Sequence, residues 1–250
     1  MRLFGLIGYP LSHSFSKKYF SAKFEKEQIH GCRYELFPIE HIGQLPEIIR
    51  QHPDLVGLNV TIPYKQQVLN YLESIHEEAA AVGAVNTICI REGKLSGFNS
   101  DVYGFGTSLE NLLKPVQGAA PAKALVLGSG GAAKAFWYVL EKKNIPYLTV
   151  SRSPGEEQIS YQQLDKGIME EYRLIINTTP LGMAPKTDAC PDIPYHLLGS
   201  QHALFDLVYN PEKTLFLARG AEQGARIQNG LEMLHLQAER SWEIWNNPSQ

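Results

Sequence analysis

The chain has 250 residues, of which 44% are hydrophobic and 20% are charged. This composition is typical of folded domains and excludes a disordered chain. Its 23 lysines and arginines face 26 acidic residues, so no excess of positive charge favours nucleic acid or an anionic membrane. No run approaches the roughly 20 apolar residues that span a bilayer. We therefore expect that the protein binds neither nucleic acid nor a membrane.

The three cysteines predict a reducing environment. Cys32, Cys89 and Cys190 lie far apart and lack the paired spacing of a zinc site or a disulfide framework. The first eight residues are apolar only briefly and lead into Tyr9-Pro10, which is not typical of a signal peptide. We therefore expect a cytoplasmic protein that holds no metal.

Candidate strands and helices alternate along the first half of the chain. The pattern predicts strands at residues 3–8, 33–39 and 55–61, and helices at 14–28 and 42–51. Because parallel strands need such crossover helices, we expect a mostly parallel sheet. Next come a predicted polar helix at 65–82, a hairpin of 87–91 with 94–98, and a helix at 101–114 capped by Ser100 or Asp101.

A second alternating pattern follows residues 115–122, whose two prolines and one glycine are typical of a linker. It predicts strands at 123–127, 147–151, 174–177 and 203–208, and helices at 131–142, 214–223 and 231–245. The last of these helices is too apolar to remain in water, so we expect it to pack back on the protein. The whole chain therefore predicts an α/β protein of two domains.

A glycine turn joins the strand at 123–127 to the helix that follows, with the sequence Gly128-Ser129-Gly130-Gly131-Ala132-Ala133. In such a unit the first glycine permits the turn and the second lets the backbone approach a pyrophosphate, which amides at the helix N-terminus hold. This arrangement predicts a dinucleotide cofactor. The alternative is that the glycines only form the turn.

The end of the next strand indicates which dinucleotide. Arg152 stands there, and a guanidinium can bind the 2′-phosphate of NADP, whereas a carboxylate would bind the 2′-hydroxyl of NAD. Glu156 and Glu157 follow and would repel that phosphate if the loop folds back. We therefore predict that the cofactor is NADP. One alternative is that the cofactor is NAD, and the simplest alternative is that Arg152 is a surface arginine that binds no ligand.

Polar residues also follow the predicted strands of the first half. Ser14 and Ser16 precede a helix, where both can donate to a carboxylate, although helix capping accounts for one of them. Asn86 and Asn99 offer donors and acceptors suited to a polyol. Thr61 shares one face of its strand with Asn59.

Lys65 and Asp101 are the candidate acid–base pair. Pro63 is expected to start a helix with Lys65 in its first turn, where the helix dipole disfavours a cation and eases loss of a proton. Asp101 can orient the amine and stabilise its ammonium form. The simpler alternatives are an exposed lysine and a capping aspartate.

These clusters and the glycine turn resemble the shikimate dehydrogenase family, and the resemblance covers nearly the whole chain. Three later runs also resemble segments of that family: Ile176-Asn177-Thr178-Thr179-Pro180-Leu181-Gly182-Met183, Asp206-Leu207-Val208-Tyr209-Asn210-Pro211 and Asn229-Gly230-Leu231-Glu232-Met233-Leu234-His235-Leu236-Gln237. That family reduces 3-dehydroshikimate to shikimate with NADPH and no metal, in the biosynthesis of chorismate and aromatic amino acids. The resemblance implies a substrate-binding domain of residues 1–114 plus 229–250 and a Rossmann-type NADP-binding domain of residues 115–228.

The resemblance also implies a role for individual residues. Lys65 and Asp101 would be catalytic. The substrate-binding residues would be Ser14, Ser16, Thr61, Asn86, Asn99, Tyr209 and Gln237. The cofactor-binding residues would be Gly128, Ser129, Gly130, Gly131, Ala132, Arg152, Thr178 and Gly230.

Three alternative functions remain at this point. The first is a quinate/shikimate dehydrogenase that uses NAD, and the second is a folate-type methylene dehydrogenase, against which the paired serines argue. The third is a non-catalytic NADP-binding sensor, against which Lys65 and Asp101 argue. The sequence holds no pattern that decides between a monomer and a homodimer.

Overall fold

The computed structural model describes residues 1–11, 14–114 and 123–247, so the predicted linker at 115–122 lies outside the described residues. The chain forms two compact units, which we call unit 1 (Met1–Asp101 and Gln237–Gln250) and unit 2 (Val102–Leu236). The domain boundaries expected from the sequence stay a prediction. Among the helices of the described segments, none is long and apolar enough to cross a membrane.

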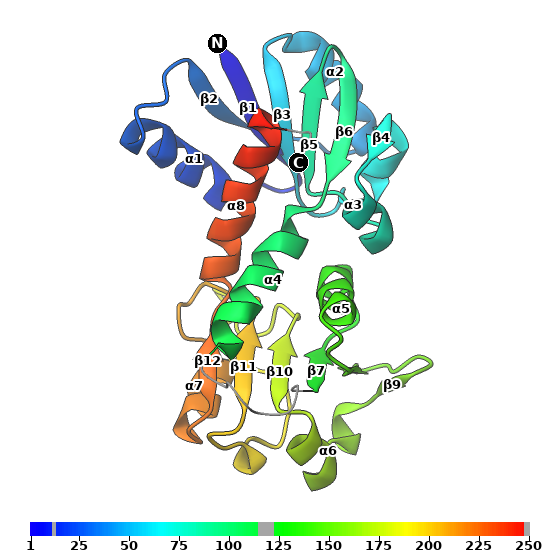
Figure 1. The fold of residues 1–250 in the computed structure, drawn as a ribbon, viewed down its shortest axis with the longest axis vertical. Helices are drawn as coiled ribbons and strands as arrows, with labels where there is room; N and C mark the ends of the chain where they lie inside the picture. The colour runs from blue at the N-terminus through cyan, green and yellow to red at the C-terminus, as the bar shows by residue number, and fades with distance from the viewer. Residues whose placement is uncertain (12–13, 115–122, 248–250) are drawn as a thin grey trace. The chain divides into compact units, whose positions relative to one another are not determined.

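Unit 1 is built on a mixed sheet with the strand order β2-β1-β3-β5-β6-β4 (Figure 1). Its strands are β1 (Arg2–Gly8), β2 (Cys32–Pro38), β3 (Leu55–Val60), β4 (Ser74–Ile75), β5 (Thr87–Arg91) and β6 (Lys94–Phe98). Its helices are α1 (Phe15–Lys26), η1 (Ile42–Gln44), α2 (Leu45–Gln51), η2 (Gln67–Tyr71), α3 (Glu77–Val82), the start of α4 (Ser100–Leu113) and the end of α8 (Leu231–Asn246).

The pairing in this sheet follows the predicted pattern. β1 lies between β2 and β3 and is parallel to both, while β5 and β6 form the expected antiparallel hairpin. Successive side chains of β1 enter two different cores, because a strand points alternate residues to opposite faces. Leu3 and Ile7 join the core that includes Leu45 of α2, whereas Phe4 and Leu6 join the core on the opposite face.

Trp245 of α8 fills the centre of that second core. Its ring lies 4.8 Å from the ring of Phe4 and 5.3 Å from that of Phe20, and its Nε1 donates to the carbonyl of Ile88 at 3.0 Å. Gly57 makes room for it, since a Cβ at this position would lie 2.3 Å from Trp245 Nε1. The final helix therefore packs back on the protein, as its apolar sequence predicts.

The predicted helix at residues 65–82 is wrong. Turns occupy the residues after β3, the short helix η2 follows, and only residues 77–82 form an α-helix, α3. The physical reason is that β4 pairs with β6, and Glu73 accepts a hydrogen bond from the backbone amide of Leu95 at 2.5 Å. Pairing with the sheet therefore replaces helical hydrogen bonds, and Lys65 does not lie in the first turn of an α-helix.

The predicted cap of α4 is also wrong. The helix begins at Ser100, and Asn99 Oδ1 accepts from the amide of Asp101 at 3.1 Å, so Asn99 is the capping residue. The Ser100 side chain does not cap the helix, because it is completely buried and its hydroxyl bonds to other side chains. The side chain of Asp101 is consequently available for Lys65.

Unit 2 contains a parallel sheet with the strand order β12-β11-β10-β7-β8-β9. Its strands are β7 (Ala124–Leu127), β8 (Tyr147–Val150), β9 (Gln158–Ile159), β10 (Leu174–Asn177), β11 (Ala203–Asp206) and β12 (Arg226–Gln228). Its further helices are α5 (Ala133–Lys142), η3 (Tyr161–Gln163), α6 (Lys166–Glu171), η4 (Tyr195–Leu197) and α7 (Leu215–Glu222). This is the strand order of a Rossmann fold.

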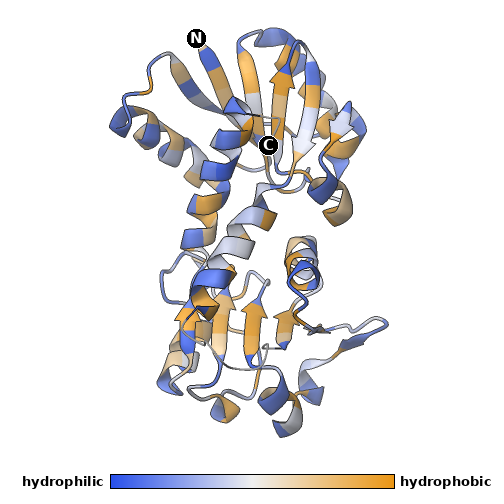
Figure 2. Ribbon diagram, in the orientation of Figure 1, coloured by the Kyte–Doolittle hydropathy of each residue, from blue (hydrophilic) through white to orange (hydrophobic). Residues whose placement is uncertain are grey.

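The central strands of unit 2 are mostly hydrophobic (Figure 2) and completely buried, as expected for the inner strands of a parallel sheet. The predicted α/β class with two parallel-rich sheets is thus confirmed. The sequence pattern did not predict β4, β9, β12 and α6, because elements of two to six residues show too little periodicity.

One carboxylate joins the ends of the two strands β10 and β11. Asp206 is fully buried, and its Oδ1 accepts from Asn177 Nδ2 at 2.9 Å and from the amide of Val208 at 3.0 Å. Its Oδ2 accepts from the hydroxyl of Thr214 at 2.5 Å. Thr214 is the N-cap of α7, so the same carboxylate reaches that helix.

We predict that Trp245→Ala lowers the free energy of unfolding by about 3–5 kcal/mol, because it removes a fully buried indole and leaves a cavity. Urea denaturation of the whole chain measures the loss. Trp242→Ala is the matched control, since Trp242 also lies against Phe4 but is only half-buried, and its loss should be smaller. Equal losses would contradict the central place of Trp245 in this core.

Asp206 also predicts a pH dependence of stability. Burial raises the pKa of Asp206 from 3.8 to about 6, although hydrogen bonds from Thr214, Val208 and Asn177 oppose the rise. The folded state therefore binds the proton more tightly than the unfolded state. The stabilisation is fully present below pH 3.8 and is lost as the pH rises through about 6.

The comparison that tests this is wild type against Asp206→Asn, in thermal unfolding at a series of pH values. Titrations of other groups cancel in the difference between the two proteins. The stability of wild type relative to the variant should fall by on the order of 3 kcal/mol between pH 4 and pH 7. A difference that stays constant with pH would show that Asp206 does not titrate in this range.

Candidate functional site

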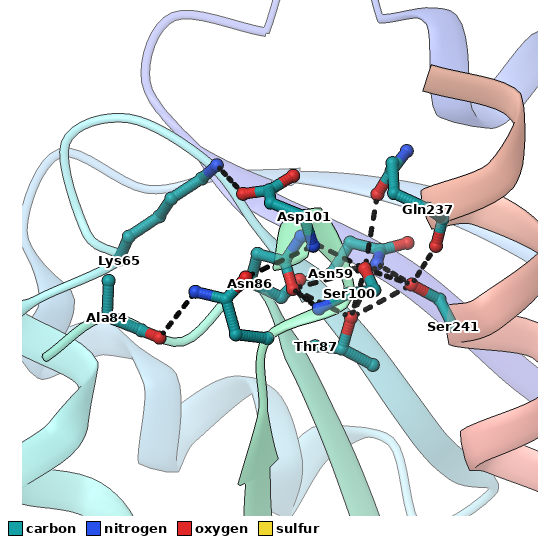
Figure 3. A network of polar contacts seen from close by, with 10 residues as sticks. Asn59, Lys65, Ala84, Asn86, Thr87, Ser100, Asp101, Gln237 and Ser241 are labelled. Atoms are coloured by element: carbon teal, nitrogen blue, oxygen red, sulfur yellow. Dashed lines mark hydrogen bonds and ion pairs between the residues drawn. The ribbon is translucent and has the colours of Figure 1, made fainter. Parts of the chain in front are cut away.

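Lys65 and Asp101 form an ion pair in unit 1. Lys65 Nζ lies 2.7 Å from Asp101 Oδ2, although the residues are 36 positions apart in the sequence (Figure 3). The Lys65 side chain is 33% exposed and that of Asp101 18% exposed, so a ligand can reach the pair. The arrangement gives a proton donor next to a carboxylate that orients it.

Three loops hold this pair in place. The carbonyl of Lys65 accepts from the amide of Val85 at 2.8 Å, and the carbonyl of the neighbouring Ala84 accepts from Asn99 Nδ2 at 2.9 Å. Asn99 in turn caps the helix that begins with Ser100 and Asp101. Both ends of the Asn99 amide are thus used inside the protein, and its side chain fixes the position of Asp101.

A buried cluster of hydroxyl groups lies beside the pair (Figure 3). Thr87, Ser100 and Ser241 are completely buried, and their oxygens lie 2.8 to 3.2 Å from one another. Asn86 donates to Ser100 Oγ at 3.0 Å and accepts from the Ser100 amide at 2.7 Å. Gln237 Oε1 accepts from Ser100 Oγ at 3.4 Å, so this cluster joins β5, α4 and α8.

Tyr34 and Asn59 extend the same network. Burial raises the pKa of Tyr34, while a hydrogen bond with Ser16 opposes the rise. The phenol therefore stays protonated and donates to Asn59 Oδ1 at 2.8 Å, which leaves Asn59 Nδ2 to donate to Ser241 Oγ at 3.0 Å. Tyr34 is thereby connected to Ser241 through hydrogen-bonded side chains.

Ser14 differs from its neighbour Ser16. Its Oγ is buried and has no hydrogen-bond partner among the residues that the structure describes. A buried hydroxyl without a partner costs about 1–3 kcal/mol, which an acceptor from a ligand would recover. This is the property expected of a group that binds an anion.

The structure brings many of the predicted substrate residues into one unit. Asn86, Asn99 and Gln237 lie in the network around Lys65 and Asp101, and Ser16 lies near Tyr34, which belongs to the same network. Thr61 follows β3 and is half-buried. Tyr209 belongs to unit 2, where it is 36% exposed.

The sequence reasoning missed several residues of the network. Tyr34, Thr87, Ser100 and Ser241 were not predicted as site residues, and Asn59 was noted only as a neighbour of Thr61. Ser241 carried a detectable signal, since it stands four residues after Gln237 and so lies on the same helix face. Tyr34 carried none, because a tyrosine in a strand is an ordinary core residue.

The glycine turn of unit 2 has the features that a dinucleotide needs. Gly128 has a φ of 106°, which favours glycine, and Ala133 is fully buried where α5 begins. A Cβ at Gly130 or Gly131 would meet no atom within 4 Å, and the two amides make no hydrogen bond to the described residues. The turn thus offers open space and free backbone donors beside a helix N-terminus, which suits a pyrophosphate.

The other predicted cofactor residues differ in their surroundings. Ser129 and Arg152 are exposed, and Ala132 is exposed at the N-cap of α5. The Thr178 hydroxyl donates to the carbonyl of Leu127 at 2.8 Å, so it ties β10 to β7. A Cβ at Gly230 would lie 2.2 Å from the carbonyl oxygen of Leu207, so close backbone packing alone requires a glycine there.

The described residues include no group of three or more His, Cys, Asp or Glu side chains that could hold a metal ion. The network of unit 1 presents an amine, a carboxylate, amides and hydroxyls. The chemistry available in unit 2 is that of an anion-binding turn followed by an exposed guanidinium.

Comparisons with known proteins indicate the family to which the chain belongs. Residues 6–88 match the family model described as the shikimate dehydrogenase substrate binding domain. A curated relative from Clostridium beijerinckii, named shikimate dehydrogenase (NADP(+)), is 40% identical over 254 residues, which covers 98% of this chain and 92% of the relative.

Solved structures share the fold along the whole chain. Shikimate 5-dehydrogenase from Thermus thermophilus, in complex with NADP(H) and shikimate, has a TM-score of 0.82 and 30% identity, with 98% of this chain and 93% of that chain covered. Shikimate 5-dehydrogenase from Listeria monocytogenes, in complex with shikimate and NAD, has a TM-score of 0.81 and 26% identity, with 98% and 92% covered. The chain therefore belongs to the shikimate dehydrogenase family of oxidoreductases.

Proposed function

We propose that this protein is an NADP-dependent shikimate dehydrogenase, which reversibly reduces 3-dehydroshikimate to shikimate in the biosynthesis of chorismate and aromatic amino acids. The observation that carries the proposal is the Lys65–Asp101 ion pair beside a network of amides and hydroxyls. The family of the chain supports the same reaction class.

Lys65 is the proposed acid–base group. In the direction of reduction its ammonium gives a proton to the carbonyl oxygen of the substrate, and in the reverse direction the amine takes it back. Asp101 accepts a hydrogen bond from Lys65 Nζ, which orients the amine. NADPH, when bound, supplies the hydride.

The remaining polar residues of unit 1 would bind the substrate. The Ser14 hydroxyl, which has no partner among the described residues, would donate together with Ser16 to the substrate carboxylate. Thr61, Asn86, Asn99, Gln237 and Tyr209 would position the ring hydroxyls. For Asn86 and Asn99, hydrogen bonds within the protein fix the plane of each amide before a ligand arrives.

Unit 2 would hold the cofactor. The free amides of Gly130 and Gly131 suit its pyrophosphate, with Gly128, Ser129 and Ala132 shaping the turn around them. Arg152 is exposed beyond β8 and would bind the 2′-phosphate of NADP in two parallel hydrogen bonds. Thr178 and Gly230 complete the proposed cofactor contacts.

A second candidate is a quinate/shikimate dehydrogenase that uses NAD. One observation favours it: the related Listeria monocytogenes structure contains shikimate and NAD. Glu156 and Glu157, which follow Arg152, act in the same direction because they would repel a 2′-phosphate. Steady-state rates with shikimate and quinate, each with NADP and with NAD, decide between the two candidates. Inactivity with all four combinations would favour the non-catalytic sensor.

We predict that Lys65→Ala lowers kcat for shikimate oxidation by about 10²–10⁴, with a smaller effect on the KM of shikimate, because the variant loses a positioned acid–base group. Absorbance of reduced nicotinamide measures the rate. Lys94→Ala is the control, since Lys94 is an exposed lysine at the start of β6. Unchanged turnover in Lys65→Ala would remove Lys65 from the mechanism.

Arg152→Ala is predicted to raise the KM of NADP by about tenfold to a hundredfold, because it removes a charge-assisted pair of hydrogen bonds worth about 1.5–3 kcal/mol. The KM of NAD should stay the same, since NAD lacks the 2′-phosphate. Arg173→Ala, at another exposed arginine of unit 2, serves as the control. An equal rise for both cofactors would mean that Arg152 does not select NADP.

A further inference from the structure

Asp206 is buried without a positive partner. Its side chain has no exposed surface, and the described residues place no lysine, arginine or histidine in an ion pair with it. Three hydrogen-bond donors satisfy it instead, from Asn177, Val208 and Thr214. Because desolvating a carboxylate is costly, such a group indicates a task that an apolar residue could not perform.

The hydrogen bonds of Asn177 lead toward the glycine turn. Asn177 Nδ2 donates a hydrogen bond to Asp206. Asn177 Oδ1, at the other side of the same amide group, accepts from the amide of Thr179 at 3.0 Å and from the Thr179 hydroxyl at 2.6 Å. The Thr179 hydroxyl also accepts from the amide of Leu181 at 3.3 Å. The carboxylate of Asp206 therefore fixes the segment after β10 through one intermediate side chain.

That segment lies directly against Gly128. A Cβ at Gly128 would lie 2.9 Å from Thr178 Oγ1 and 2.9 Å from Thr179 Cγ2. The Thr178 amide donates to the carbonyl of Leu127 at 3.0 Å, so the two strand ends are also joined through their backbones. A shift of residues 178–179 would move the first residue of the turn whose amides remain free.

We propose that Asp206 is a positioning residue for the glycine turn, acting through Asn177 and Thr179. The proposal rests on the proposed function, because the turn matters only if it binds a dinucleotide. The positioning concerns the pyrophosphate, which NADP and NAD share, and not the 2′-phosphate. Loss of this positioning should therefore weaken both cofactors by the same factor, unlike loss of Arg152.

Two threonines on opposite sides of Asp206 provide a matched test. Thr179 connects to it through Asn177 on the side of the glycine turn, whereas Thr214 bonds to it directly on the side of α7. Thr→Val keeps the shape and removes the hydroxyl at each position. Isothermal titration calorimetry of the whole protein with NADP+ and with NAD+ then gives the Kd of each variant.

We expect Thr179→Val to raise both Kd values by about threefold to tenfold, because the variant loses the hydroxyl that bonds to Asn177 and to Leu181. Thr214→Val should leave both values unchanged, although it loses stability at a helix cap. If Asp206 only stabilised the fold, each variant with a lower melting temperature would also have a higher Kd. Thr214→Val would then weaken binding as well. That result, or no change in Thr179→Val, would overturn the proposal.

Amide hydrogen exchange of residues 178–183 in the ligand-free protein provides a second measurement that does not need the cofactor. Exchange there should be faster in Thr179→Val than in wild type or Thr214→Val, and equal exchange in all three would overturn the proposal. If wild type binds neither dinucleotide, the proposed function fails, whereas exchange in Asp206→Asn still decides whether Asp206 fixes this segment. It should be faster than in wild type, as in Thr179→Val, and exchange equal to that of wild type would overturn the role of Asp206.

Discussion

The Lys65–Asp101 pair depends on hydrogen bonds that fasten separate loops at one end of a sheet. The backbone of Lys65 is held by Val85, and Asp101 is held by its capping residue Asn99. Both charged side chains therefore extend from backbone that is held by hydrogen bonds, so the geometry of the pair is set before any ligand binds. The hydroxyl cluster behind the pair adds α8 to the same assembly through Ser241.

The two units present polar groups in different ways. Unit 1 uses side chains, and nearly all of them bond to one another inside the protein. Unit 2 uses the backbone, and its glycine turn leaves amides free because no side chain occupies the space around Gly130 and Gly131. Lys65 and Asp101 in unit 1 and the glycine turn in unit 2 follow the carboxyl ends of strands, which is where open α/β sheets bind ligands.

Much of this fold could be predicted from the sequence, because long apolar strands and amphipathic helices carry a clear period. The pattern failed at residues 65–82, where pairing of β4 with β6 outweighs the local preference for a helix. In the site, the sequence indicated Lys65 and Asp101 as a pair, and the structure places them 2.7 Å apart. It could not indicate Asp206 or Tyr34, whose importance depends on burial and on partners distant in the chain.

Gly57 and Trp245 fit each other across 188 positions of sequence, and this has a consequence for synthesis of the protein. Unit 2 is one continuous segment, whereas the core of unit 1 contains Ala238, Ile244 and Trp245 from the far end of α8. Unit 1 therefore begins first on the ribosome but cannot complete its core until those residues have emerged. During that interval Phe4 and Phe20 lack the indole that covers them, so the nascent chain exposes an aromatic surface until the end of α8 has been synthesised.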